Sequence, residues 1–157
     1  MNDNFEILNF NTIAVTGHRV IERGFDKKRL EKLFNDLIEK NFNTFLIGMA
    51  LGFDTLCFQI LEKLRERYNI RIIACVPCLS QSKMFNEKQK IEYDRMISIA
   101  DKVILVSEEY DQKCMQRRNE FMVDHASGVV AYLRREYGGT ANTVRYAIKK
   151  GVPVIKV

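Results

Sequence analysis

The sequence predicts an α/β protein with a three-layer Rossmann-like fold, in which a mostly parallel sheet of about six strands is flanked by helices. Short runs of β-branched and apolar residues alternate strictly with longer amphipathic segments along the 157 residues. The short runs are nearly continuous in apolar residues, as expected for strands that helices cover on both faces. No internal repeat or low-complexity segment interrupts this alternation.

The first two β-α units show both periodicities. Strands are expected at residues 12–15 and 44–47, where β-branched and apolar residues cluster. Helices are expected at 26–40 and 53–68, because apolar residues recur there at spacings of three and four and so form one stripe. The stripe residues are Leu30, Leu33, Phe34, Leu37 and Ile38 in the first helix and Leu56, Ile60, Leu61 and Leu64 in the second.

Three further units and a last strand repeat the pattern. Strands are expected at residues 70–76, 102–106, 128–133 and 154–157, and helices at 85–100, 112–125 and 142–150.

The helix at 112–125 carries both core and charged positions. Helical spacing turns Met115, Phe121 and Met122 toward the core, which is the usual place of methionine and aromatic side chains. Arg117 and Arg118 project in different directions, so we expect only one of them to serve a ligand site.

Length and composition fit a single domain spanning residues 1–157. With 46% hydrophobic residues, a chain of this length buries roughly two-thirds of the surface that it exposes when unfolded. The sequence contains no apolar run of 18 residues and no leader-like segment, and the first ten residues resemble a loose terminus. We therefore expect a cytoplasmic protein that does not enter a membrane.

The cysteines and the net charge narrow the function classes. Cys57, Cys75, Cys78 and Cys114 are too few for a disulfide framework. Cys75 and Cys78 have redox or zinc spacing, but no second pair or paired histidines follow, so we expect no metal. The net charge of +5 suits a small anionic ligand. Because no nucleic-acid signature is present, nucleic acid is not an expected partner.

Two loops at the carboxyl ends of strands predict a phosphate site, because ligands of parallel α/β sheets bind at that edge. Gly138, Gly139 and Thr140 lie between a strand and a helix, where backbone N–H groups can approach an anion. The alternative is an ordinary glycine turn. The residues at 16–19, Thr-Gly-His-Arg, add a tight turn and a guanidinium, and the histidine could serve a ligand or simply fill the turn.

A third loop at the same edge contains Gly48, Ala50 and Gly52, which leave the backbone bare before the next helix. Asp54 lies in the first turn of that helix. It could accept hydrogen bonds from sugar hydroxyls, or it could compensate the helix dipole. Glu108, in an acidic loop after the fourth strand, could likewise touch a ribose or decorate the surface.

Together, these motifs resemble the YpsA-like branch of the SLOG superfamily, whose members carry TGHR, GMALG-D, RN--MVD and GGT segments. They occur here at residues 16–19, 48–54, 118–124 and 138–140, and the match covers nearly the whole chain. The resemblance implies a Rossmann-like domain that binds a nucleotide or an ADP-ribose-like ligand and requires no cofactor. The residues it assigns to the ligand are Thr16, Gly17, His18, Arg19, Gly48, Ala50, Gly52, Asp54, Arg118, Asn119, Gly138, Gly139, Thr140 and Thr143.

More distantly, the chain is similar to DprA-type domains and to the LOG nucleotide phosphoribohydrolases, which use an arginine and a glutamate. Arg118 occupies the arginine position, but Arg145 or Tyr146 stands where the glutamate is needed. Glycosidic cleavage usually needs a carboxylate, so the resemblance favours ligand binding, with no catalytic residue assigned. Arg118, Asp124 and Glu108 are the catalytic candidates. The alternatives are a nucleoside monophosphate N-glycosidase and a nucleotide-regulated protein-interaction module, and a homodimer is expected from the prevalence of two-fold pairs.

Overall fold

The fold is given by a computed structural model that describes residues 9–157. Six strands form one sheet, and every neighbouring pair in it is parallel. The predicted α/β fold with a six-stranded sheet is therefore confirmed, and the sheet is parallel throughout. The strands are β1 (Thr12–Gly17), β2 (Thr44–Ile47), β3 (Arg71–Val76), β4 (Lys102–Leu105), β5 (Gly128–Tyr132) and β6 (Val154–Lys156).

Within residues 9–157 five helices connect the strands, and side chains cap the starts of two of them, α1 and α3. Asp26 accepts a hydrogen bond from the backbone N–H of Arg29, and Asn86 forms a reciprocal capping box with Gln89. The helices are α1 (Lys27–Glu39), α2 (Phe53–Arg65), α3 (Glu87–Ile99), α4 (Cys114–Asp124) and α5 (Gly139–Lys149), and a 3-10 turn (Asn9–Asn11) precedes β1.

Two predicted boundaries were wrong by three residues. Helix α2 ends at Arg65 rather than at residue 68, and α5 begins at Gly139 rather than at residue 142. In α5, Gly138 adopts a φ of 95° and ends the preceding loop, so the helix begins immediately after it. Gly139 and Thr140 thus belong to the first turn of α5 rather than to a loop before it.

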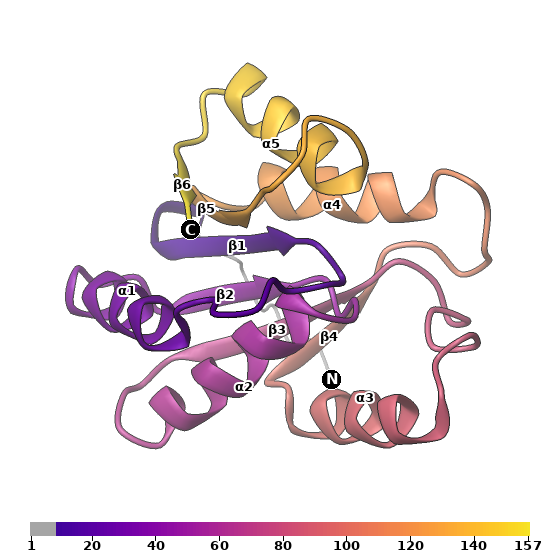
Figure 1. The fold of residues 1–157 in the computed structure, drawn as a ribbon, viewed down its shortest axis with the longest axis horizontal. Helices are drawn as coiled ribbons and strands as arrows, with labels where there is room; N and C mark the ends of the chain where they lie inside the picture. The colour runs from indigo at the N-terminus through magenta and orange to yellow at the C-terminus, as the bar shows by residue number, and fades with distance from the viewer. Residues whose placement is uncertain (1–8) are drawn as a thin grey trace, which may run out of the picture.

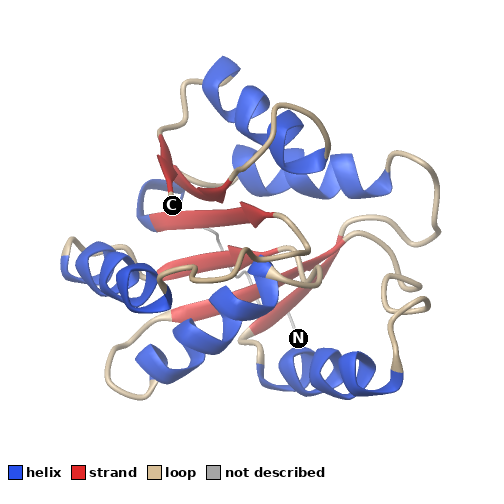
Figure 2. Cartoon of the chain, viewed as in Figure 1, coloured by secondary structure: helices blue, strands red, loops and turns tan. Residues whose placement is uncertain are grey.

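The helices cover the two faces of the sheet, as Figures 1 and 2 show. Helices α1, α2 and α3 pack on one face around a core that includes Phe34, Phe45 and Phe58. Helices α4 and α5 pack on the other face over a smaller core that includes Val123 and Val144. The predicted three layers are therefore present.

The order of the strands, β4-β3-β2-β1-β5-β6, places β1 beside β5. Strand β5 pairs with β1 over its whole length, from Gly128 opposite Ile13 to Tyr132 opposite Gly17. The chain after β1 leads to α1 on one face, whereas the chain after β5 leads to α5 on the other. Such a point, where the chain leaves two neighbouring strands in opposite directions, opens a crevice at the carboxyl edge of the sheet.

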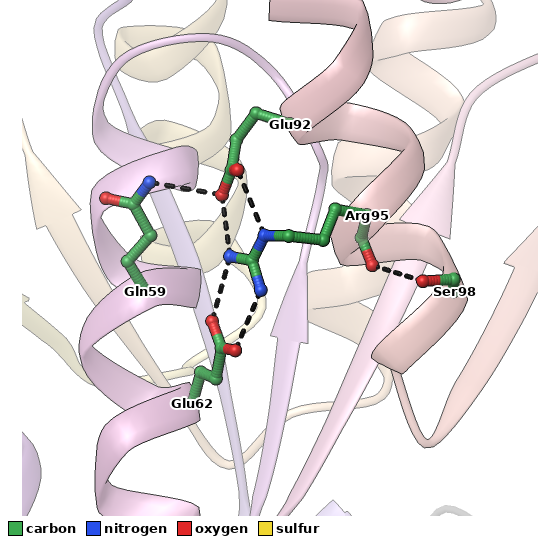
Figure 3. Close-up of polar contacts among 5 residues, drawn as sticks. All are labelled: Gln59, Glu62, Glu92, Arg95 and Ser98. Atoms are coloured by element: carbon green, nitrogen blue, oxygen red, sulfur yellow. Dashed lines mark hydrogen bonds and ion pairs between the residues drawn. The ribbon is translucent and has the colours of Figure 1, made fainter.

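An ion network joins α2 to α3 away from this crevice (Figure 3). The Arg95 guanidinium donates to both carboxylate oxygens of Glu62, at 2.8 and 3.0 Å, and to Glu92 of its own helix. Gln59 donates to the same Glu92 carboxylate at 3.2 Å. These bonds lower the pKa of Glu92 and raise that of Arg95, since each favours the charged form.

The expected loose terminus falls mostly on residues 1–8, which lie outside the described residues. Within residues 9–157, none of the helices is both long enough and apolar enough to cross a bilayer.

Candidate functional site

A cavity of about 620 Å³ occupies the crevice between β1 and β5. Its walls are the loops after β1 and β5, the N-terminal turns of α2 and α5, and one side of α4. Ten of the fourteen residues assigned to the ligand line this cavity: Thr16, Gly17, His18, Arg19, Ala50, Asp54, Arg118, Asn119, Gly139 and Thr140.

The other four assigned residues, Gly48, Gly52, Gly138 and Thr143, are not among those that line it. The Gly48 carbonyl accepts hydrogen bonds from Gln81 and Arg118, so this residue holds the loop after β2 in place. Thr143 donates its hydroxyl to the Gly139 carbonyl at 2.8 Å, which is a bond within the first turns of α5. Their positions assign them supporting roles.

The glycines near the cavity differ in whether the surrounding protein leaves room for a side chain. A Cβ on Gly17 would lie 2.4 Å from the Phe53 ring, and one on Gly52 would lie 2.1 Å from the Arg19 carbonyl oxygen. Protein packing alone therefore requires these two glycines. A Cβ on Gly139, in contrast, would meet no described atom within 4 Å. It would project into open space at the start of α5, where a ligand could approach.

His18 is held in one tautomer. Its Nε2 accepts a hydrogen bond from the backbone N–H of Arg134 at 2.9 Å, so the proton of the neutral ring lies on Nδ1. Burial lowers the pKa of His18, and the charges of Arg135 and Arg134 lower it further. The ring packs edge-on against Tyr132. His18 thus joins the loops after β1 and β5 and presents a neutral N–H donor.

Sequence reasoning missed Arg134 and Arg135, which also line the cavity. Arg134 donates to Glu22 at 2.9 Å, and its guanidinium lies 4.3 Å from the centre of the Tyr132 ring. The available signal was the pair of arginines directly between a buried strand and the glycine loop. Charged residues between a strand and a helix are typical of an ordinary exposed turn. Only the pairing of β1 with β5 brings these two arginines close to His18.

Helix α4 contributes Met115, Arg118 and Asn119 to the cavity. The expected core position of Met115 was wrong, because its side chain is 36% exposed and Cys114 occupies the buried position instead. The two arginines diverge: Arg118 is buried, whereas Arg117 is exposed and forms an ion pair with Asp111.

Asp54 and Arg118 lie at the floor of the cavity and are 5% and 4% exposed. The Asp54 Oδ2 atom accepts the backbone N–H of Ala50 at 3.1 Å, while Oδ1 accepts no hydrogen bond from any described residue. Burial raises the pKa of Asp54 to about 6, although the nearby Arg118 charge opposes the shift. A buried acceptor without a partner is unusual in a folded protein and indicates a ligand or a bound water.

The other two catalytic candidates lie elsewhere. Glu108 is exposed in the loop after β4, and Asp124 is exposed at the end of α4, where it accepts the Tyr146 hydroxyl at 2.8 Å. Neither carboxylate belongs to the cavity lining.

The cysteines form no metal site in the part of the chain that the structure describes. All four are buried free thiols, and burial raises the pKa of Cys75 to about 12. A thiol with such a pKa is protonated at neutral pH and is a poor metal ligand or nucleophile.

Comparison with known families agrees with this architecture. The YpsA family model, described as the YspA SLOG family, matches residues 13–152, which include every wall of the crevice. The chain belongs to the YpsA SLOG family. The resemblance read from the four motifs is thereby confirmed.

Relatives of this YpsA-family chain occur in Bacillus species. The SPbeta prophage-derived protein YoqJ of Bacillus subtilis is 34% identical over 139 residues, covering 78% of this chain and 80% of YoqJ. A UPF0398 protein of Bacillus licheniformis is 24% identical, covering 82% of this chain and 77% of that protein.

Two solved structures of DNA processing protein A, DprA, share the fold. The Streptococcus pneumoniae protein aligns with a TM-score of 0.70 at 20% identity, covering 94% of this chain and 50% of that one. The Helicobacter pylori protein, whose structure concerns single-stranded DNA binding, aligns with a TM-score of 0.65 at 16% identity, covering 92% and 64%. This YpsA-family chain therefore spans half to two-thirds of the DprA chains that it resembles.

Proposed function

We propose that the crevice between β1 and β5 binds a nucleotide or a nucleotide-derived ligand. The observation that carries the proposal is the N-terminal turn of α5, which borders the cavity with Gly139 and Thr140 and has no side-chain cap. The first N–H groups of a helix need an acceptor, and the helix dipole favours an anion there. A phosphate group satisfies both requirements.

The charge of the cavity supports the same ligand class. Arg19, Arg134 and Arg135 line it together with the neutral His18 donor, and only Glu22 and Asp54 oppose them. Guanidinium groups bind phosphate through paired N–H donors. A volume of about 620 Å³ also lies within the range of roughly 300–1,000 Å³ that is usual for small-molecule sites.

A thermal-shift panel tests this proposal. The purified protein is heated with nucleoside mono-, di- and triphosphates, ADP-ribose and inorganic phosphate. A ligand at 100 times its Kd adds about 2.7 kcal/mol to the free energy of unfolding and so raises Tm. If no phosphate-bearing compound raises Tm, the proposal is wrong.

The DprA likeness makes short single-stranded DNA a necessary member of the panel. That likeness, at 16–20% identity, concerns the fold, and the sequence led us to expect no nucleic-acid partner. If an oligonucleotide binds with a steep salt dependence and mononucleotides do not bind, the ligand is a nucleic acid rather than a small molecule.

A second candidate function, N-glycosidic cleavage of a nucleoside monophosphate, gains support from Asp54. This carboxylate lies in the same cavity as Arg118, although it comes from α2 rather than from the loop before α5. It could stabilise an oxocarbenium-like centre or orient water. Free base released from a mononucleotide, and lost in both Arg118→Ala and Asp54→Asn, would establish the activity.

A homodimer and a cytoplasmic location stay predictions. Sedimentation of the purified protein with and without ligand would measure the first, and cell fractionation would measure the second.

A further inference from the structure

We propose that Asp54 and Arg118 together form a hydroxyl-recognition subsite, which selects ligands with a ribose diol over their deoxyribose counterparts. The inference rests on the proposed function, because it assigns the sugar of that ligand to the floor of the crevice.

The first step is the unsatisfied hydrogen-bonding capacity of Asp54. One of its carboxylate oxygens, Oδ2, is fixed by the Ala50 backbone N–H, which orients the group. The other, Oδ1, is buried and has no partner within residues 9–157. A buried carboxylate oxygen without a donor is costly, unless a bound water or a ligand supplies that donor.

The second step is the donor beside it. Arg118 directs Nε to Asn119 Oδ1 at 2.8 Å, and Nη1 to the carbonyls of Gly48 and Cys75. These bonds fix the guanidinium plane through Nε and Nη1. A Cβ on Gly48 would lie 2.9 Å from the Arg118 Cζ atom and 3.0 Å from Asp54 Oδ2, so both groups approach the same point.

The chemistry of this pair favours a hydroxyl group over a phosphate group. A phosphate dianion has no proton to donate to Asp54 and carries a charge of the same sign. An exocyclic amine donates but does not accept from the guanidinium. A hydroxyl group both donates and accepts, so one hydroxyl suits the Asp54 carboxylate and the Arg118 guanidinium together. Phosphate belongs at the other wall, at the start of α5 and beside Arg134 and Arg135.

Calorimetric titration with matched sugars tests the subsite independently of the base. The probes are ribose 5-phosphate and 2-deoxyribose 5-phosphate, followed by the nucleotide with the largest thermal shift in its ribo, 2′-deoxy and 3′-deoxy forms. We expect the ribo form to bind at least about tenfold more tightly than one or both deoxy forms, because a buried charged partner is otherwise left unpaired.

Variants assign the discrimination to Asp54. In Asp54→Asn a neutral acceptor remains, and we expect the ribo-to-deoxy ratio of affinities to fall at least about threefold, since charged acceptors bind roughly twice as strongly. In Asp54→Ala the ratio should approach one. Glu31→Gln removes an equal charge from an exposed site on α1 and should leave the ratio unchanged.

Each outcome decides a different claim. Equal binding of ribo and deoxy forms to the wild-type protein overturns the subsite and leaves the proposed nucleotide function standing. A ratio that survives in both Asp54 variants overturns the assignment to this residue. If no phosphate compound binds, the proposed function and the subsite fall together.

Discussion

At the scale of single residues, Asp54 combines two opposite effects. A carboxylate in the first turn of a helix normally stabilises it through the helix dipole, and the sequence allowed that reading. The structure buries this carboxylate and leaves one oxygen unpartnered, while its pKa rises to about 6. Ionised Asp54 therefore opposes folding at neutral pH, which is typical of a group retained for function.

The first prediction concerns the stability of Asp54→Asn. The folded protein binds the Asp54 proton more tightly than the unfolded chain, whose pKa is near 3.8. The contribution of this group to the free energy of unfolding therefore falls as pH rises from about 4 to 6 and stays low above that range. At pH 7, Asp54→Asn should raise the free energy of unfolding by on the order of 3 kcal/mol, measured by urea denaturation.

Two controls make this prediction sharp. At pH 4 the variant and the wild-type protein should differ little, because Asp54 is then protonated in the folded state. Glu31→Gln should change stability by less than about 0.5 kcal/mol at either pH. A loss of stability in Asp54→Asn at pH 7 would instead identify Asp54 as a structural helix residue.

At the scale of elements, two adjacent glycines at the start of α5 have different roles. Gly138 provides a backbone angle that the fold needs, and Gly139 leaves space that a ligand can occupy. Gly138 has a φ of 95°, a conformation that L side chains rarely adopt, and it therefore ends the loop after β5. Gly139 has no positive φ, and a Cβ there would meet nothing in the described protein. The first glycine is needed by the fold, and the second is needed only if something else occupies the space.

The matched pair Gly138→Ala and Gly139→Ala separates the two requirements. Gly138→Ala should lower the free energy of unfolding by about 1–2 kcal/mol, because it places a Cβ at positive φ. Gly139→Ala should leave stability unchanged or raise it by up to about 1 kcal/mol. It should nevertheless weaken phosphate binding in the thermal-shift panel. Unaltered ligand binding in Gly139→Ala would remove the first turn of α5 from the site.

At the scale of the whole molecule, the sheet sets which parts of the site are rigid. Strands β1 and β5 lie in the interior of the sheet and are almost fully buried, whereas β4 lies at an edge, with Val103 43% and Leu105 39% exposed. The crevice opens beside these two interior strands, so its walls at His18 and Arg134 rest on a buried part of the sheet.

Amide hydrogen exchange tests this difference. Amides of the interior strands β1, β2, β3 and β5 should exchange most slowly, near the rate set by global unfolding, because each of these strands has a neighbour on both sides. Amides of the edge strands β4 and β6 should exchange faster. Equal protection across the sheet would show that it opens only as one unit.

The sequence by itself determined the fold class, the six strands and five helices of residues 9–157, and the edge of the sheet at which the cavity lies. These features depend on hydrophobic periodicity and on turn residues, and both are properties of residues close together in the sequence. Its errors came where a backbone angle outweighed propensity, as at Gly138, or where a helix turned a side chain outward, as at Met115.

Only the tertiary structure decided which of the predicted residues meet. The bond between His18 and Arg134 joins residues 116 positions apart, and Arg118 reaches the Gly48 carbonyl across 70. No local pattern encodes such distances, because they follow from the order of the strands and the packing of α4 and α5. The same packing distinguished the glycines that the fold requires from the one that faces open space, and it gave the cavity a buried carboxylate, Asp54, beside Arg118.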